Sequence, residues 1–179
     1  MKKALLLVLG LLASCATPVQ QALTAEQVTA AVTVERDEFS KTATFDAPTG
    51  GHDEGDGNGA RWFLRAVQST EVPSVVRFVL RFHRYSPEWC FYSSAWAQDG
   101  KQLKLDRTDS KVDAGVGMAI CRDYYSVSLT REDLERAARE GMRIKLSSRR
   151  GDWVLGFPAY YAAGFLARVD GAQPAMPAK

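Results

Sequence analysis

The chain has 179 residues, of which 46% are hydrophobic and 25% are charged, as in an ordinary globular protein. This length suits one domain with a buried core and is too short for two domains of ordinary size. The formal net charge is only +2, which gives no electrostatic reason to expect nucleic acid or another polyanion as a partner.

The first fifteen residues carry the most specific signal. Lys2 and Lys3 precede an apolar run over residues 4–13, which is too short to cross a bilayer and leads into Leu-Ala-Ser-Cys at residues 12–15. This pattern is typical of a secretory signal, and its last four residues resemble the lipobox of bacterial lipoproteins. The resemblance covers residues 1–15 alone. It implies that Cys15 is modified with diacylglycerol and becomes the first residue of the mature protein.

The resemblance implies a lipid-anchored protein of the bacterial cell envelope. Cys15 would carry more than one acyl chain, which is enough for stable attachment to a membrane. Many inner-membrane lipoproteins have aspartate where this chain has Ala16, so the outer membrane is favoured, with the domain facing the periplasm. Without Lys2 and Lys3 the chain has 21 basic and 21 acidic residues, so the mature protein is neutral. Cleavage near Ala13 by an ordinary signal peptidase is the alternative, and it would leave a plain third cysteine.

Cys90 and Cys121 remain as an even pair once Cys15 is assigned to the lipid. In an oxidising compartment we expect a disulfide between them, which would stabilise the fold by about 3 kcal/mol on the chain-entropy model. Two buried free thiols are the alternative.

The signal over residues 1–14 is followed by three regions of different composition. Residues 15–27 are small and polar and predict a lipidated tether with at most one helical turn at its end, residues 28–169 predict a single β-rich domain, and residues 170–179 predict a disordered tail. The domain begins with β-branched and aromatic residues over residues 28–47, which predict two strands or one bent strand.

Residues 48–59 are rich in glycine and acidic residues and predict a mobile surface loop. From Glu54 onwards the loop partly matches an EF-hand calcium loop. The match fails because Arg65 lies where that loop needs its bidentate glutamate. We therefore expect a solvated loop and no dedicated metal site, and a weak adventitious ion site is the alternative.

Clear strands follow this loop. Residues 75–85 alternate over their whole length, with apolar residues at the even positions 76–82 and Arg77, Arg81 and His83 on the opposite face. A half-polar second face predicts an antiparallel sheet with one side in water. The other predicted strands are residues 62–67, 89–97, 101–105, 119–129, 142–146 and 153–157. Asp-Gly at residues 99–100 predicts a tight hairpin turn, and residues 108–117 predict a polar loop.

Two helices are expected late in the chain. Thr130 and Asp133 form a variant of the capping box, and Gly141 is a plausible stop, so a helix is predicted over residues 131–140. A short C-terminal helix over residues 159–169 would begin after Pro158. Seven or eight short strands with these helices predict a mainly β fold, an antiparallel β-sandwich or barrel-like structure.

The sequence lacks the motifs that mark common catalytic and cofactor sites. It has no nucleophile elbow, no closely spaced zinc ligands and no phosphate-binding loop with its lysine. We therefore expect no catalytic residue, no cofactor and no metal.

The candidates for a ligand or partner face are Arg77, Arg81, His83 and Trp96. Arginines that converge could hold a carboxylate or phosphate, and the same holds for Arg84, Arg149 and Arg150. Exposed tryptophans could stack on sugar rings, although core packing is the competing interpretation for Trp62, Trp89, Trp96 and Trp153.

These features predict a non-enzymatic binding, interaction or structural module, held at the membrane by the lipid on Cys15. Its partner would be an envelope protein, cell-wall glycan or small ligand, and not nucleic acid. The alternative is a hydrolase of envelope polymer with an Asp/Glu or His83 centre.

Overall fold

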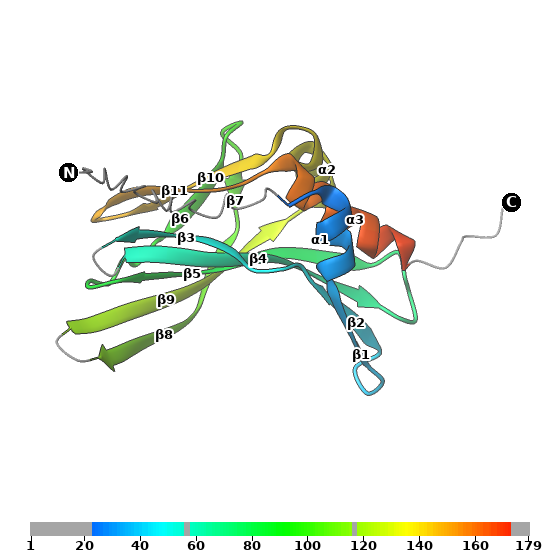
Figure 1. Ribbon diagram of the computed structural model, residues 1–179, viewed down its shortest axis with the longest axis horizontal. Helices are drawn as coiled ribbons and strands as arrows, with labels where there is room; N and C mark the ends of the chain where they lie inside the picture. Colours follow the sequence, from blue (N-terminus) through cyan, green and yellow to red (C-terminus); the bar gives the residue numbers. More distant parts are fainter. Residues whose placement is uncertain (1–22, 56–57, 116–117, 173–179) are drawn as a thin grey trace, which may run out of the picture.

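The computed structural model describes residues 23–55, 58–115 and 118–172, so the signal region and Cys15 lie outside the described residues. Over the described residues the chain forms eleven strands and three helices, with two antiparallel sheets that lie face to face (Figure 1). The predicted mainly β antiparallel fold is confirmed. Of the two predicted forms, the structure has the sandwich-like one, because the two sheets remain separate and do not close into a barrel.

The larger sheet has seven strands in the order β1–β2–β4–β5–β9–β8, and β3 pairs with the part of β4 that β2 does not cover. Its strands are β1 (Thr33–Asp37), β2 (Thr42–Asp46), β3 (Gly50–Gly55), β4 (Asn58–Ser69), β5 (Val76–Ser86), β8 (Leu105–Gly115) and β9 (Met118–Leu129).

The smaller sheet has four strands in the order β11–β10–β6–β7. They are β6 (Ser94–Ala97), β7 (Gln102–Leu103), β10 (Met142–Ser148) and β11 (Gly151–Phe157). Gly100, with φ at 84°, lies in the turn between β6 and β7, as Asp-Gly predicts.

Alternating side chains form the core between the sheets. Leu64, Leu80 and Val127 point inward from the larger sheet and are fully buried. Ile144 and Leu155 of the smaller sheet belong to the same core, and they are almost fully buried. Burial of such apolar side chains is the main stabilising contribution to a fold of this kind.

Helices close one end of the sandwich (Figure 1). α2 (Arg131–Glu140) has the predicted bounds, and Thr130 and Asp133 exchange the expected capping hydrogen bonds. α3 (Ala159–Gly171) is the predicted C-terminal helix, and it extends two residues past the predicted end, into the predicted tail. None of the helices that the structure describes is long and apolar enough to cross a membrane.

The first helix is longer than the single turn expected at the end of the tether, and it includes residues 28–31, which were predicted as strand. α1 (Ala25–Ala31) begins within the predicted tether, and Val28 is fully buried against the core. Thr24 and Gln27 form a capping box, a signal that is readable in the sequence. The folded domain therefore starts before residue 28.

Two predicted loops are strands. Residues 48–59 contain β3 and the start of β4, and residues 108–117 contain most of β8. Glycine-rich β3 can lie close to β4, because a Cβ at Gly50 would come within 2.4 Å of the Trp62 ring. These two segments contain few apolar residues, and charged pairs between neighbouring strands help to stabilise them. Arg61 of β4 and Asp53 of β3, for example, lie 3.2 Å apart.

Candidate functional site

A cleft of about 490 Å³ opens between the sheets at the end away from the helices, and we call it the open cleft. The hairpin ends β3–β4, β8–β9 and β10–β11 all lie at this end (Figure 1). The walls of the open cleft come from the start of β4, the end of β5, the segment after β5 and the β10–β11 hairpin. The lining includes Arg84, Glu88, Trp89, Tyr92, Arg150 and Trp153.

Arg84 is the buried charge of the open cleft. It follows Leu80 and Phe82 on the inner face of β5, and only 9% of its surface is exposed. Its Nη2 donates a 2.7 Å hydrogen bond to Glu54 Oε2, and its guanidinium lies 5.0 Å from the centre of the Trp153 ring. Nε and Nη1 are buried, and no described residue accepts a hydrogen bond from either.

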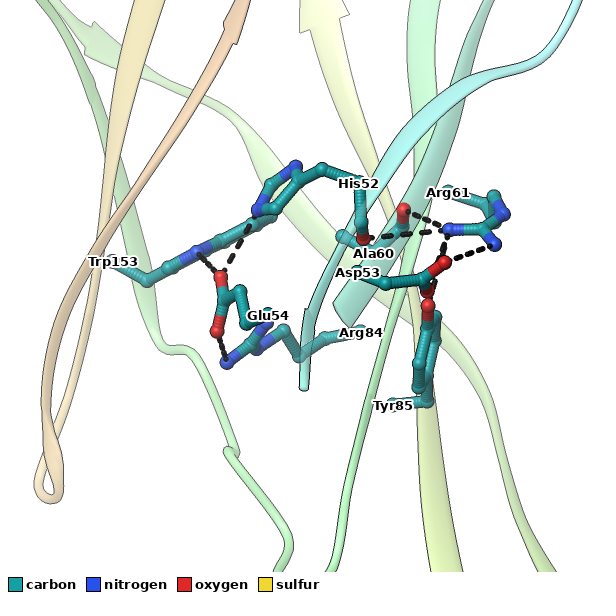
Figure 2. A network of polar contacts seen from close by, with 8 residues as sticks. All are labelled: His52, Asp53, Glu54, Ala60, Arg61, Arg84, Tyr85 and Trp153. Atoms are coloured by element: carbon teal, nitrogen blue, oxygen red, sulfur yellow. Dashed lines mark hydrogen bonds and ion pairs between the residues drawn. The ribbon is translucent and has the colours of Figure 1, made fainter. Parts of the chain in front are cut away.

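Glu54 collects donors from three strands (Figure 2). Besides Arg84, its carboxylate contacts His52 Nε2 at 3.0 Å and accepts a 3.1 Å hydrogen bond from Trp153 Nε1. The hydrogen bond from Arg84 is the main reason that the pKa of Glu54 falls to about 2. Glu54 is therefore ionised at neutral pH and forms a charged pair with Arg84.

Arg84 remains charged although burial disfavours the charged form. Burial lowers the pKa of Arg84, but the hydrogen bond and the charge of Glu54 more than offset this, so the net pKa is raised. The guanidinium thus stays charged while two of its nitrogens have no described acceptor. Buried donors without acceptors are costly, so this site favours an added acceptor such as an anion or a water molecule.

Two aromatic rings, Tyr92 and Trp153, line the wall beside Arg84 and stack with ring centres 6.1 Å apart. Phe82 and Tyr125 pack against these two rings and stack on one another at 5.1 Å. The hydroxyl of Tyr125 accepts a 2.9 Å hydrogen bond from the backbone N–H of Tyr92, which fixes the segment after β5 against the sheet. Burial raises the pKa of Tyr125 to about 12, so this hydroxyl remains neutral.

Asp123 secures the same segment from β9. Its carboxylate is 2% exposed and accepts hydrogen bonds from the backbone N–H of Cys90 at 3.1 Å and from Ser110 Oγ at 3.0 Å. Arg107 Nε lies 3.3 Å from the same carboxylate. The cleft wall is therefore held by buried polar contacts to β9, and β8 in turn holds Asp123.

The structure separates the four residues of the predicted ligand face. Arg77, Arg81 and His83 lie together on the outer face of β5, away from the open cleft. Trp96 lies on β6 of the smaller sheet, where its neighbours Ala95 and Ala97 point into the core and Trp96 does not.

The outer face of β5 has a second hollow of about 280 Å³, with Phe63, Arg81, His83 and Tyr124 among its lining residues. Burial lowers the pKa of His83, and the charges of Arg122 and Arg61 lower it further. Its ring neighbours are Tyr85 and Tyr124. His83 is therefore a neutral residue in a basic and aromatic setting at neutral pH.

Two residues of the site were missed because they lie in the predicted loop. His52 and Glu54 point inward from β3, on the side of the sheet that carries Arg84. Arg84 itself had a readable signal, since it continues the even positions of the apolar face of β5. An arginine on an apolar face is expected to find a partner or a ligand.

Cys90 and Cys121 lie near the same residue, Ser86. Cys121 is the cross-strand partner of Ser86, and Cys90 Sγ is 3.7 Å from Ser86 Oγ. Both cysteines are free thiols in the structure, Cys90 half-buried and Cys121 buried. The predicted disulfide stays a prediction.

No family model matches the chain, and no curated protein or solved structure matches it either. Function therefore has to be inferred from the open cleft and from the sequence itself.

Proposed function

We propose that the chain is a lipid-anchored protein of the bacterial envelope that acts as a non-enzymatic binding module, with a small ligand in the open cleft. The lipobox resemblance of residues 1–15 supports the anchor. The cleft volume of about 490 Å³ supports the ligand, since pockets for small molecules typically measure about 300–1,000 Å³.

Arg84 is the observation that carries this proposal. A buried cation such as Arg84, beside an aromatic ring, contributes little to stability, because the loss of its hydration offsets much of its attraction to Glu54. The same arrangement suits recognition, because ligand sites combine mostly apolar walls with a few placed polar groups. Arg84 and Trp153 provide this combination at the wall of an accessible cleft.

The hydrolase alternative gains no support from the described residues. His83 lies on the outer face of the larger sheet among tyrosines and arginines, away from the open cleft. A general acid in glycoside hydrolysis needs a raised pKa. Every described carboxyl group with a displaced pKa has it lowered, and Glu54 has the largest displacement.

The binding function can be tested with 8-anilinonaphthalene-1-sulfonate, a fluorescent aromatic anion. We expect the purified full-length protein to bind this probe saturably at one site. Trp153→Leu removes an aromatic wall and the ring beneath Arg84, so it should weaken binding by about tenfold.

Trp96→Leu is the matched control, because Trp96 is also a half-buried tryptophan of the smaller sheet but lies outside the open cleft. It should leave probe binding unchanged. Circular dichroism and thermal unfolding of each variant exclude binding by a partly unfolded chain. Absence of saturable binding, or equal weakening by both variants, would overturn the proposal.

A further inference from the structure

We propose that the ligand of the open cleft carries a carboxylate, and that this carboxylate displaces Glu54 from Arg84, Trp153 and His52. This inference rests on the proposed function of the open cleft. It adds the chemical class of the ligand and identifies an internal competitor.

The donors around Glu54 already form a carboxylate receptor. Arg84 Nη2 contacts one carboxylate oxygen at 2.7 Å, and Trp153 Nε1 and His52 Nε2 contact the other at 3.1 and 3.0 Å (Figure 2). Both oxygens are therefore bound, by groups from β3, β5 and β11. Arginine and aromatic N–H groups placed in this way match the planar shape and charge of a carboxylate.

Glu54 is the residue of this cluster that a ligand can displace most easily. Its side chain is 34% exposed, whereas that of Arg84 is 10% exposed. It lies on β3, which pairs with β4 alone among the described strands, and the register of that pair shifts between Asp53 and Gly55. Edge strands at such irregularities have fewer ladder hydrogen bonds to hold them. Arg84, by contrast, lies on β5, which pairs on both sides.

Displacement of Glu54 would make a donor nitrogen of Arg84 available to a ligand. Nε and Nη1 are shielded from solvent and have no acceptor among the described residues, while Nη2 is occupied by Glu54. A ligand carboxylate that replaces Glu54 would take over its contacts to Arg84 Nη2, Trp153 and His52. Trp153 and Tyr92, which both line the open cleft, then provide aromatic contacts for the body of the ligand.

Benzoate is the simplest probe of this class, and benzamide is its neutral counterpart of the same shape. We expect the full-length protein to bind benzoate at least about tenfold more tightly than benzamide, because the charge-assisted hydrogen bonds require a carboxylate. Glu54→Gln removes the charge of the competitor but keeps its size. It should tighten benzoate binding by about tenfold and leave benzamide binding unchanged.

Glu135→Gln is the matched control. Glu135 also pairs with an arginine, Arg131, but it lies on α2, away from the open cleft, so its neutralisation changes the net charge equally and leaves the cleft unchanged. It should change benzoate binding by less than about twofold. If Glu54→Gln fails to fold, Glu54→Asp provides the second variant, because a shorter carboxylate should hold Arg84 less well and also tighten benzoate binding.

Each outcome has a distinct meaning. Equal tightening by Glu54→Gln and Glu135→Gln would overturn the inference, since a general charge effect would then explain it. Equal binding of benzoate and benzamide would also overturn it. Binding of the naphthalene sulfonate without any binding of benzoate would defeat the carboxylate inference and leave the binding function intact, whereas failure of both probes would defeat both.

Discussion

Arg84 and Asp123 are direct cross-strand partners on the inner face of β5 and β9, yet each pairs with a different residue. Arg84 donates to Glu54 of β3, while Asp123 lies 3.3 Å from Arg107 of β8. Buried charges at this end of the sandwich therefore connect strands on either side of the central pair. The connection to Glu54 depends on the ionisation of a carboxyl group, so it should respond to pH.

We expect acid to remove the contribution of Glu54 to stability. The ordinary pKa of the group is 4.5, and the folded protein lowers it to about 2. A lowered folded pKa means that stabilisation is complete above pH 4.5 and is lost as the pH falls towards 2. Near pH 6, Glu54→Gln should lower the free energy of unfolding by about 1–2 kcal/mol, a value reduced for the solvent screening of a partly exposed group.

Urea unfolding of both proteins between pH 6 and pH 2 measures this difference. Other carboxyl groups also weaken the fold in acid, so the informative quantity is the gap between the wild-type protein and Glu54→Gln. This gap should close towards pH 2. A gap that keeps its size over the whole range would show that the ion pair with Arg84 does not stabilise the fold.

The central fold was predictable because its strands alternate strongly. Over much of their length β5 and β9 place apolar residues at alternate positions, and the capping residues Thr130 and Asp133 define the start of α2. These signals are local and depend on few residues. They were sufficient for the mainly β class and for the correct bounds of α2.

The edge strands and the site were harder to predict, because their stabilising partners are distant in sequence. β3 consists of glycine and charged residues, and its strand conformation depends on pairing with β4 and on the contacts of Glu54 to Arg84 and Trp153. Residue 54 and residue 153 are far apart in the chain, and composition alone does not bring them together. Charged pairs between β8 and β9 explain in the same way why a polar segment forms a strand.

Gly164 explains how α1 packs closely on α3. A Cβ at this position would lie 2.3 Å from the backbone oxygen of Ala25, and Thr29 Oγ1 donates a 2.9 Å hydrogen bond to the backbone oxygen of Gly164. Gly164→Ala should therefore destabilise the protein by about 1–3 kcal/mol, even though alanine favours a helix by about 1 kcal/mol over glycine.

Gly171→Ala is the control in the same helix, because no atom of the described residues, apart from its chain neighbours and its own helix backbone, lies within 4 Å of a Cβ at that position. It should leave the free energy of unfolding within about 0.5 kcal/mol of the wild-type value. Thermal and urea unfolding of both variants measures the two effects. A Gly164→Ala variant as stable as Gly171→Ala would mean that the contact between α1 and α3 is not tight in solution.

The anchor can be tested independently of the domain. If Cys15 is acylated, the full-length protein expressed in a bacterium should incorporate an alkyne-labelled fatty acid and sediment with the membranes. Cys15→Ala should lose both properties, whereas Cys90→Ala should keep both. Density-gradient separation of the membranes then distinguishes outer from inner. Retention of the label in Cys15→Ala would contradict the lipoprotein prediction.

Cys90 and Cys121 provide the last prediction, because both lie beside Ser86 at the end of β5. We expect oxidation to join them in protein taken from the envelope, with a stabilisation of about 3 kcal/mol that a reductant removes. Mass spectrometry after alkylation should then find no modified thiol before reduction and two after it. In Cys121→Ala the disulfide cannot form, so half-buried Cys90 should accept one alkyl group without reduction. This control checks that the alkylating reagent can reach Cys90. Two alkyl groups on the unreduced wild-type protein would mean that the thiols are free, as they are in the structure.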